Sequence, residues 1–152
     1  MEILALTKYS ESGASSRLRT YQYANFLEQK GINLNISPLL SDKYIYDLQR
    51  GKKNYLEALK GYLKRLFIIF FRKKVDFLWI EYEVFPWLPY FIENIILLRN
   101  RGYALDYDDA VFHSYDKNSS TLVRVLLGRK HNKLMKNSNF VSVGNNYLAS
   151  KA

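Results

Sequence analysis

The sequence predicts an α/β protein with a Rossmann-like, doubly wound parallel sheet and helices on both faces. Short apolar runs alternate with longer segments whose apolar residues recur every three or four positions, the pattern of repeating β/α units. The run Phe77–Tyr82 is apolar at nearly every position, as in strands buried on both faces of a parallel sheet. No linker of low complexity interrupts the 152 residues, so we predict one domain, 1–152.

The first half of the chain predicts two strands and three helices. An opening apolar run, Glu2–Thr7, is expected to form the first strand, and residues 15–31 the first helix with its glycine stop. Alternation predicts a second strand over 32–36, stopped by Pro38, before helices over 42–50 and 53–72 with breaks near Gly51 and Gly61. Residues spaced by three give the first helix its core face: Leu18, Tyr21, Ala24 and Leu27.

The second half predicts three strands and three helices. After Phe77–Tyr82, further strands are expected over Tyr103–Asp109, half-buried, and over Phe140–Val143. Three helices are expected: one opened by Pro86 and Pro89, one after Ser119 or Ser120, and one from Asn145. Leu88, Phe91, Ile92, Ile95 and Leu98 stand at helical spacing in the first of these, and Leu122, Val125, Leu126 and Leu134 are expected to face inward in the second.

Composition narrows the class of protein. The absence of cysteine excludes disulfides and Cys-containing metal sites. The N-terminus lacks the features of a signal peptide, and the longest apolar run, Leu66–Phe71, is too short to span a bilayer. We therefore expect a cytoplasmic protein, soluble or peripheral on the inner face of the membrane.

Charge is distributed in blocks along the chain. Residues 50–74 carry nine Lys and Arg against one acid, residues 75–116 carry two against eight, and residues 117–152 carry seven against none. This division predicts a polar pocket within anionic surroundings. Nucleic-acid binding would explain the net charge of +9, but the acidic block would repel phosphates and no nucleic-acid-binding motif is present.

The acidic block is concentrated in Tyr103–Asp116, which reads Y-A-L-D-Y-D-D-A-V-F-H-S-Y-D. Asp106, Asp108 and Asp109 crowd the end of a predicted strand, although like charges repel. Ligands of α/β sheets bind at the carboxyl ends of the strands. We therefore predict a site here.

A second candidate site is the loop after the first strand, Ser10–Ser16. Free backbone N–H groups at a helix start attract phosphate, and Arg17 stands in the first turn, where a nearby anion would suit it. A single Gly13 is equally compatible with an ordinary turn.

These segments together resemble the N-terminal, acceptor-side domain of GT-B glycosyltransferases of the family 4 / group 1 type. The resemblance rests on S-G-A-S-S-R-L-R-T-Y-Q-Y-A-N-F-L, on L-D-Y-D-D-A-V-F-H with its following basic helix, and on F-V-S-V-G-N-N-Y-L-A. It implies retaining, metal-independent transfer of a sugar from a nucleotide-sugar to a glycan or lipid-linked acceptor in surface polysaccharide synthesis. No cofactor is implied, because the nucleotide-sugar is a substrate. A second Rossmann domain outside these 152 residues would hold the nucleotide, so this chain alone is expected to be inactive.

The resemblance also implies roles for particular residues. Gly13, Ala14 and Ser15 would border the donor phosphates, with Arg17 as a charge partner. Catalytic roles fall on Asp108, Asp109 and His113, although many relatives have His-Asp where this chain has Asp108-Asp109. Acceptor contacts fall on Glu81, Glu83 and Trp87. From the residues alone, Glu81 and Glu83 are as compatible with solvated surface, and Phe85 and Trp87 are better interpreted as core than as sugar-stacking rings.

The segment 60–74 places six basic residues around an aromatic, apolar stretch, as in helices that lie on an anionic membrane. The alternative is an ordinary helix with Lys and Arg at its rim. Two further interpretations stay open. Asp106 and Asp108 can be read as the D-x-D of a metal-dependent GT-A glycosyltransferase, and the chain can be a binding domain without catalysis.

Overall fold

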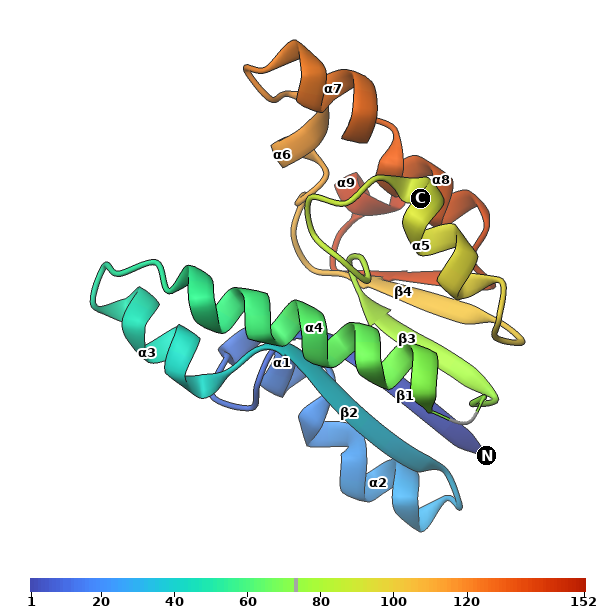
Figure 1. Cartoon of the computed structure of the whole chain (residues 1–152). Helices are drawn as coiled ribbons and strands as arrows, with labels where there is room; N and C mark the ends of the chain where they lie inside the picture. The colour runs from blue at the N-terminus through green and yellow to red at the C-terminus, as the bar shows by residue number, and fades with distance from the viewer. Residues whose placement is uncertain (73) are drawn as a thin grey trace. The chain divides into compact units, whose positions relative to one another are not determined.

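The computed structural model describes residues 1–72 and 74–152, which form two compact units, Met1–Asp76 and Phe77–Ala152 (Figure 1). Lys73, part of the predicted membrane segment, lies outside the described residues. In each unit the strands are parallel to their partners and are connected through helices. This confirms the predicted α/β, Rossmann-like class.

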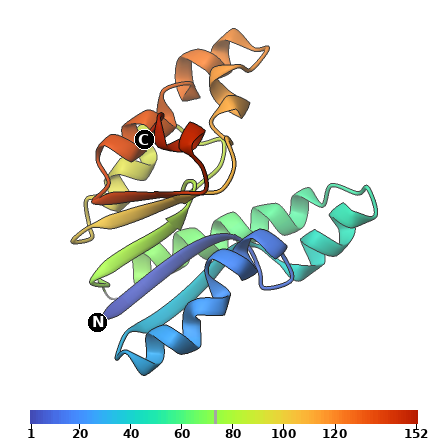
Figure 2. The same ribbon diagram turned by 180° about the vertical axis from the view of Figure 1, so that it is seen from behind.

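The first unit is built on β1 (Glu2–Tyr9) and β2 (Asn33–Leu40), which pair in parallel from Glu2↔Asn33 to Tyr9↔Leu40. Between them lie α1 (Ala14–Arg19), the 3-10 helix η1 (Tyr21–Tyr23) and α2 (Ala24–Gln29). After β2 come α3 (Asp42–Gln49) and α4 (Tyr55–Phe71). The opposite views of Figures 1 and 2 show α4 on one face of this strand pair and α2 on the other.

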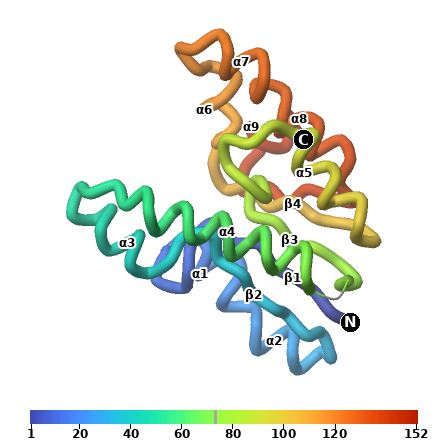
Figure 3. The backbone as a smooth tube through the Cα atoms, in the orientation of Figure 1, coloured from blue at the N-terminus to red at the C-terminus, as the bar shows by residue number. Residues whose placement is uncertain are grey.

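The second unit contains β3 (Phe77–Glu81), β4 (Tyr103–Tyr107) and β5 (Phe140–Val143), adjacent in that order. The helix α5 (Tyr90–Leu97) joins β3 to β4. Three helices, α6 (His113–Asp116), α7 (Thr121–Leu127) and α8 (Lys130–Lys136), join β4 to β5, and α9 (Asn146–Ala149) follows. The helices α5 and α8 pack on each other, while α6 and α7 extend beyond the ends of β3 and β4, as the tube in Figure 3 shows.

Two strand predictions were wrong in detail. The strand β2 continues through Pro38, which pairs with Thr7. Proline is tolerated there because β2 pairs with β1 on one side only, and an outward-facing N–H is not needed for the ladder. All five residues of β4 are buried, rather than every second one, because β4 lies between β3 and β5 and is covered on both faces.

The predicted break at Gly61 does not occur: α4 runs without interruption from Tyr55 to Phe71. A Cβ on Gly61 would lie 1.9 Å from the carbonyl oxygen of Leu39. Gly61 is therefore required by the close packing of α4 on β2, and not by a break in the helix. The first predicted helix is instead divided at Thr20, and Leu18, expected in the core, is 58% exposed.

Several apolar residues expected to face inward lie at the surface. On α7, Leu122, Val125 and Leu126 are exposed, and only Leu127 is buried. Leu134 on α8 is buried, as predicted. On α5 the buried residues are Glu93, Ile96 and Leu97. Phe91 and Ile95 of this helix are exposed, and so is Leu98, the residue that directly follows it. Among the described helices, none has the length and apolar character needed to cross a bilayer.

Candidate functional site

The carboxyl ends of β3, β4 and β5 meet at one edge of the second unit, because the strands are parallel. Tyr82 follows β3, Asp108 follows β4 and Gly144 follows β5, with the Gly144 N–H donating to the Tyr107 carbonyl at 2.9 Å. This edge is the place where an α/β sheet presents ligand-binding groups.

The predicted carboxylates of this edge occupy different environments. Asp108 and Asp109 are exposed, whereas Asp106, inside β4, is 8% exposed. The Tyr82 hydroxyl donates to Asp108 Oδ1, and Asp109 Oδ1 accepts the Ala110 N–H at 2.9 Å. Asp108 and Asp109 are thus carboxylates oriented by the chain and open to solvent. Asp106 and Asp108, the pair of the D-x-D interpretation, therefore differ: the first is buried and the second is exposed.

His113, the predicted catalytic histidine, is half-buried at the start of α6. Its Nδ1 lies 2.8 Å from Asp116 Oδ1, and its Nε2 lies 2.6 Å from the Tyr147 hydroxyl on α9. Both ring nitrogens therefore have partners, and the ring links α6 to α9. A ligand would have to displace Tyr147 to reach Nε2.

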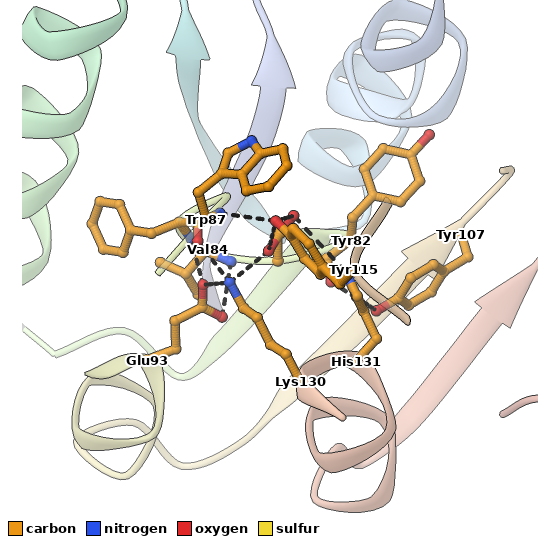
Figure 4. Close-up of polar contacts among 10 residues, drawn as sticks. Tyr82, Val84, Trp87, Glu93, Tyr107, Tyr115, Lys130 and His131 are labelled. Carbon is orange, nitrogen blue, oxygen red and sulfur yellow. Dashed lines mark hydrogen bonds and ion pairs between the residues drawn. The ribbon is translucent and has the colours of Figure 1, made fainter. Parts of the chain in front are cut away.

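The loop after β3, residues 82–87, has an unusual backbone. Tyr82 and Trp87 adopt φ values of 62° and 64°, in the left-handed region that non-glycine residues rarely occupy. Such conformations persist where the surroundings hold them and are frequent at functional sites. Here they are held by a network of buried side chains (Figure 4).

The centre of this network is Lys130 on α8, which is 1% exposed. Its Nζ lies 2.5 Å from Glu83 Oε2 and 2.8 Å from Glu93 Oε1, and it donates to the Phe85 carbonyl at 2.7 Å. The three donors of one ammonium group are therefore directed at two carboxylates and one main-chain oxygen.

The two glutamates hold the loop from opposite ends. Glu93, fully buried on α5, accepts the N–H groups of Val84 at 3.3 Å and Phe85 at 2.7 Å. Glu83 accepts the Tyr115 hydroxyl at 2.9 and 3.0 Å, and that hydroxyl in turn accepts the Trp87 N–H at 2.8 Å. The buried backbone groups of a bent loop are thus satisfied by side chains.

His131 lies beside Lys130 and extends the network to β4. Its Nδ1 is 2.7 Å from the Tyr107 hydroxyl, which donates to the Tyr82 carbonyl at 2.8 Å. The imidazole stacks on the Tyr115 ring with centroids 5.4 Å apart. Its buried Nε2 has no hydrogen-bond partner, and Glu83 Oε1 lies 3.9 Å from it.

Burial shifts the protonation equilibria in this network. Burial, with the nearby Glu83 charge, raises the pKa of Glu93 to about 7 against the opposing effect of Lys130. Burial lowers the pKa of His131 to about 4, so the imidazole is neutral at pH 7. Burial and the surrounding carboxylates raise the pKa of Tyr107 well above its usual value. Two carboxylates share one ammonium, and protonation of Glu93 removes the excess negative charge.

The predicted acceptor residues divide into two groups. Glu81 and Glu83 are buried, at 2% and 8% exposed, and Glu83 positions the loop rather than facing solvent. Phe85 is core, as interpreted from the sequence, but Trp87 is 56% exposed and not core. Its ring stands edge-on to Tyr115 with centroids 5.2 Å apart. The loop therefore presents an exposed indole on a rigid backbone.

In the first unit, part of the predicted phosphate-binding loop is engaged in contacts within the chain. The Gly13 N–H donates to the Ser10 carbonyl at 2.9 Å, and the Ser10 hydroxyl donates to Asp42 at 2.6 Å. A Cβ on Gly13 would lie 2.4 Å from the Tyr9 Cβ, so packing alone requires glycine here. Ala14 is exposed, Ser15 is half-buried, and the exposed Arg17 donates to the Glu11 carbonyl at 3.3 Å.

Sequence reasoning missed most of the buried network: Glu93, Tyr115, Lys130 and His131. One signal was available, since Glu93 is the lone acid of an apolar helix, F-I-E-N-I-I-L-L. A lone charge on an apolar helix needs a buried partner of opposite sign.

Comparisons with protein-family models, curated proteins and solved structures found no match. Within residues 1–72 and 74–152, no group of three or more His, Asp or Glu side chains is arranged to hold a metal ion. Chemically, the edge offers solvent-exposed carboxylates that accept hydrogen bonds from hydroxyl groups, and an aromatic ring on which a sugar could stack.

Proposed function

We propose that this chain is the acceptor-side domain of a GT-B glycosyltransferase. It would act in retaining, metal-independent transfer of a sugar from a nucleotide-sugar to a glycan or lipid-linked acceptor of a surface polysaccharide. Asp108 and Asp109 would receive the acceptor hydroxyl, and Trp87 would contact the acceptor ring. Gly13, Ala14, Ser15 and Arg17 would border the donor phosphates, with a further Rossmann domain holding the nucleotide.

One observation carries the proposal: the exposed carboxylates follow β4 at the carboxyl edge, beside a β3 loop fixed by buried ion pairs. An exposed carboxylate oriented by Tyr82 can accept the hydrogen of an acceptor hydroxyl in the transition state. A preorganised site of this kind needs its supporting residues locked by packing, which the Lys130 network provides.

The surface of α4 favours an acceptor at a membrane. Its one buried residue is Arg65, whose guanidinium donates to the Thr7 and Ser37 carbonyls, while an apolar row on the same helix is exposed: Leu56, Leu59, Leu63, Phe67, Phe70 and Phe71. Exposed Lys60 and Lys64 stand among these residues. An apolar row with basic neighbours suits the inner, anionic face of a membrane.

The activity is tested with the protein encoded by the complete reading frame. It is mixed with UDP-, GDP- and ADP-sugars and a lipid extract of the source cells, with and without EDTA, and nucleotide release is followed. We expect release that survives EDTA and falls at least about a hundredfold in Asp108→Ala or Asp109→Ala. Glu28→Ala, which removes an exposed carboxylate of α2, is the matched control and should retain activity. Release abolished by EDTA would instead favour a metal-dependent transferase.

Membrane contact is tested by co-sedimentation of the chain with vesicles. Binding is expected to vesicles that contain phosphatidylglycerol and not to pure phosphatidylcholine, and to be lost in Leu63→Asp and Phe67→Asp. Leu18→Asp makes the same kind of change at an exposed position of α1 and should bind normally. An absence of binding at low salt would refute the membrane proposal.

A further inference from the structure

A pocket of about 530 Å³ lies in the second unit among α5, α7 and α8. Its basic lining residues are Arg124, Arg129, Lys130 and Lys133, and Tyr90 and Thr121 contribute hydroxyl groups. No carboxylate contributes to this lining. A concave site with several converging cations and hydroxyl groups is suited to an anion.

The cations of the pocket differ in their partners. The charge of Lys130 is neutralised by Glu83 and Glu93. Within the described residues, Arg124, Arg129 and Lys133 form no ion pair with a carboxylate. The pocket therefore keeps three positive charges that the protein itself does not balance.

Arg124 is held in position by the turn before α7. One guanidinium nitrogen donates to the carbonyls of Asn118 and Ser119, and the other donates to the Thr121 hydroxyl at 2.9 Å. Lys133 stands over the Tyr90 ring, 5.5 Å from its centroid. Both side chains are exposed, but the hydrogen bonds of Arg124 hold its guanidinium in place before a ligand arrives, which lowers the entropic cost of binding.

We propose that this pocket binds a phosphate group, with Arg124, Arg129 and Lys133 as its charge partners. Arginine donates to phosphate in a bidentate manner and lysine acts as a point charge, so a mixed set suits a phosphate or diphosphate. Two sources have this chemistry: a free phosphorylated metabolite and a lipid phosphate, whose chain would lie along the exposed Leu122, Val125 and Leu126 of α7. The proposal does not depend on the transfer reaction.

The test is isothermal titration of the purified chain at about 0.15 M salt, where non-specific surface attraction is screened. One arm uses inorganic pyrophosphate, and the other uses dihexanoyl phosphatidic acid below its micelle concentration. The double variant Arg129→Gln/Lys133→Gln removes two of the three cations. The matched control, Lys117→Gln/Lys151→Gln, removes the same charge from exposed positions outside the pocket.

We expect one site per chain for at least one probe, and a loss of about a hundredfold in affinity in the pocket variant, about tenfold for each charged contact. The control should bind like the wild type, and both variants should keep the wild-type melting temperature. Tighter binding of the phosphatidic acid assigns the phosphate to a lipid, and equal binding assigns it to a free ligand. Failure of both probes to bind, or an equal loss in the control, would overturn the proposal whether or not the protein transfers sugar.

Discussion

Replacement of Lys130 by methionine would leave two buried carboxylates without their shared cation. Glu93 is fully buried and Glu83 is 8% exposed, and both lie within 2.8 Å of the Lys130 ammonium. Methionine keeps the length and the apolar stem of lysine, so the lost interaction is mainly that of the charge. The Phe85 carbonyl also loses its donor.

The cost follows from the geometry. Removal of one partner of a buried ion pair typically costs about 3–5 kcal/mol, because the remaining charge stays buried. In a domain of about 150 residues, 1 kcal/mol corresponds to a fall of about 2–4 °C in melting temperature, so a fall of about 10 °C is expected. The loss should be smaller at pH 5.5 than at pH 8, because Glu93, with a pKa raised to about 7, takes up a proton at the lower pH.

Urea denaturation followed by circular dichroism at both pH values gives the free energy of unfolding. Lys136→Met, at an exposed position on the same helix, is the control and should change stability by less than about 0.5 kcal/mol. Adding Glu93→Gln to Lys130→Met should recover part of the loss, since it removes one of the two unpaired charges. A loss below about 1 kcal/mol in Lys130→Met at pH 8 would refute the assignment of these ion pairs.

Three further predictions concern stability. Gly61→Ala should lower the free energy of unfolding by about 1–3 kcal/mol, because the alanine Cβ would meet the Leu39 carbonyl. Helix propensity alone predicts a gain of about 1 kcal/mol, so a higher urea midpoint in the variant would contradict the close packing. The pKa of Glu93 is raised from 4.5 to about 7, so its contribution to the free energy of unfolding falls by about 3 kcal/mol as pH rises from 4.5 to 7. The pKa of His131 is lowered from 6.5 to about 4, so its contribution falls by about 3 kcal/mol as pH falls from 6.5 to 4. The two oppose each other between pH 4.5 and 6.5, so Glu93→Gln should lose stability more steeply than the wild type on acidification, and parallel profiles would contradict the assignment. Tyr115→Phe should cost about 1–3 kcal/mol because Glu83 and the Trp87 N–H lose a partner, while Tyr55→Phe, at an exposed residue, should cost less than about 0.5 kcal/mol; equal melting temperatures would count against the Tyr115 contacts.

The strands and the fold class follow from local pattern. A short, continuous apolar run such as Phe77–Ile80 is typical of a parallel strand buried on both faces, and the structure has β3 there. The helix end predicted at Gly31 is also confirmed, because Gly31 has a φ of 75°, the left-handed conformation that glycine adopts after a helix. Gly61 looked like the same signal, but its cause is the distant carbonyl of Leu39, which no local window contains.

The site was only partly predictable for a similar reason. Asp108 and Asp109 follow a recognisable strand, so their place at its carboxyl end could be predicted. The pairing of Lys130 with Glu93 spans 37 positions and depends on how α5 and α8 pack. Helical spacing likewise identified Leu122, Val125 and Leu126 as one apolar face, but spacing does not say what covers that face, and here they are exposed.

The central claim, that the carboxylates after β4 serve the acceptor, is tested most directly by steady-state kinetics on the protein encoded by the complete reading frame. Initial rates are measured for wild type and Asp108→Asn, first against lipid extract at saturating nucleotide-sugar and then against nucleotide-sugar at saturating extract. The account predicts that Asp108→Asn lowers kcat or raises the KM for the extract and leaves the KM for the nucleotide-sugar unchanged. A raised KM for the nucleotide-sugar alone, with normal kcat and normal dependence on the extract, would contradict it.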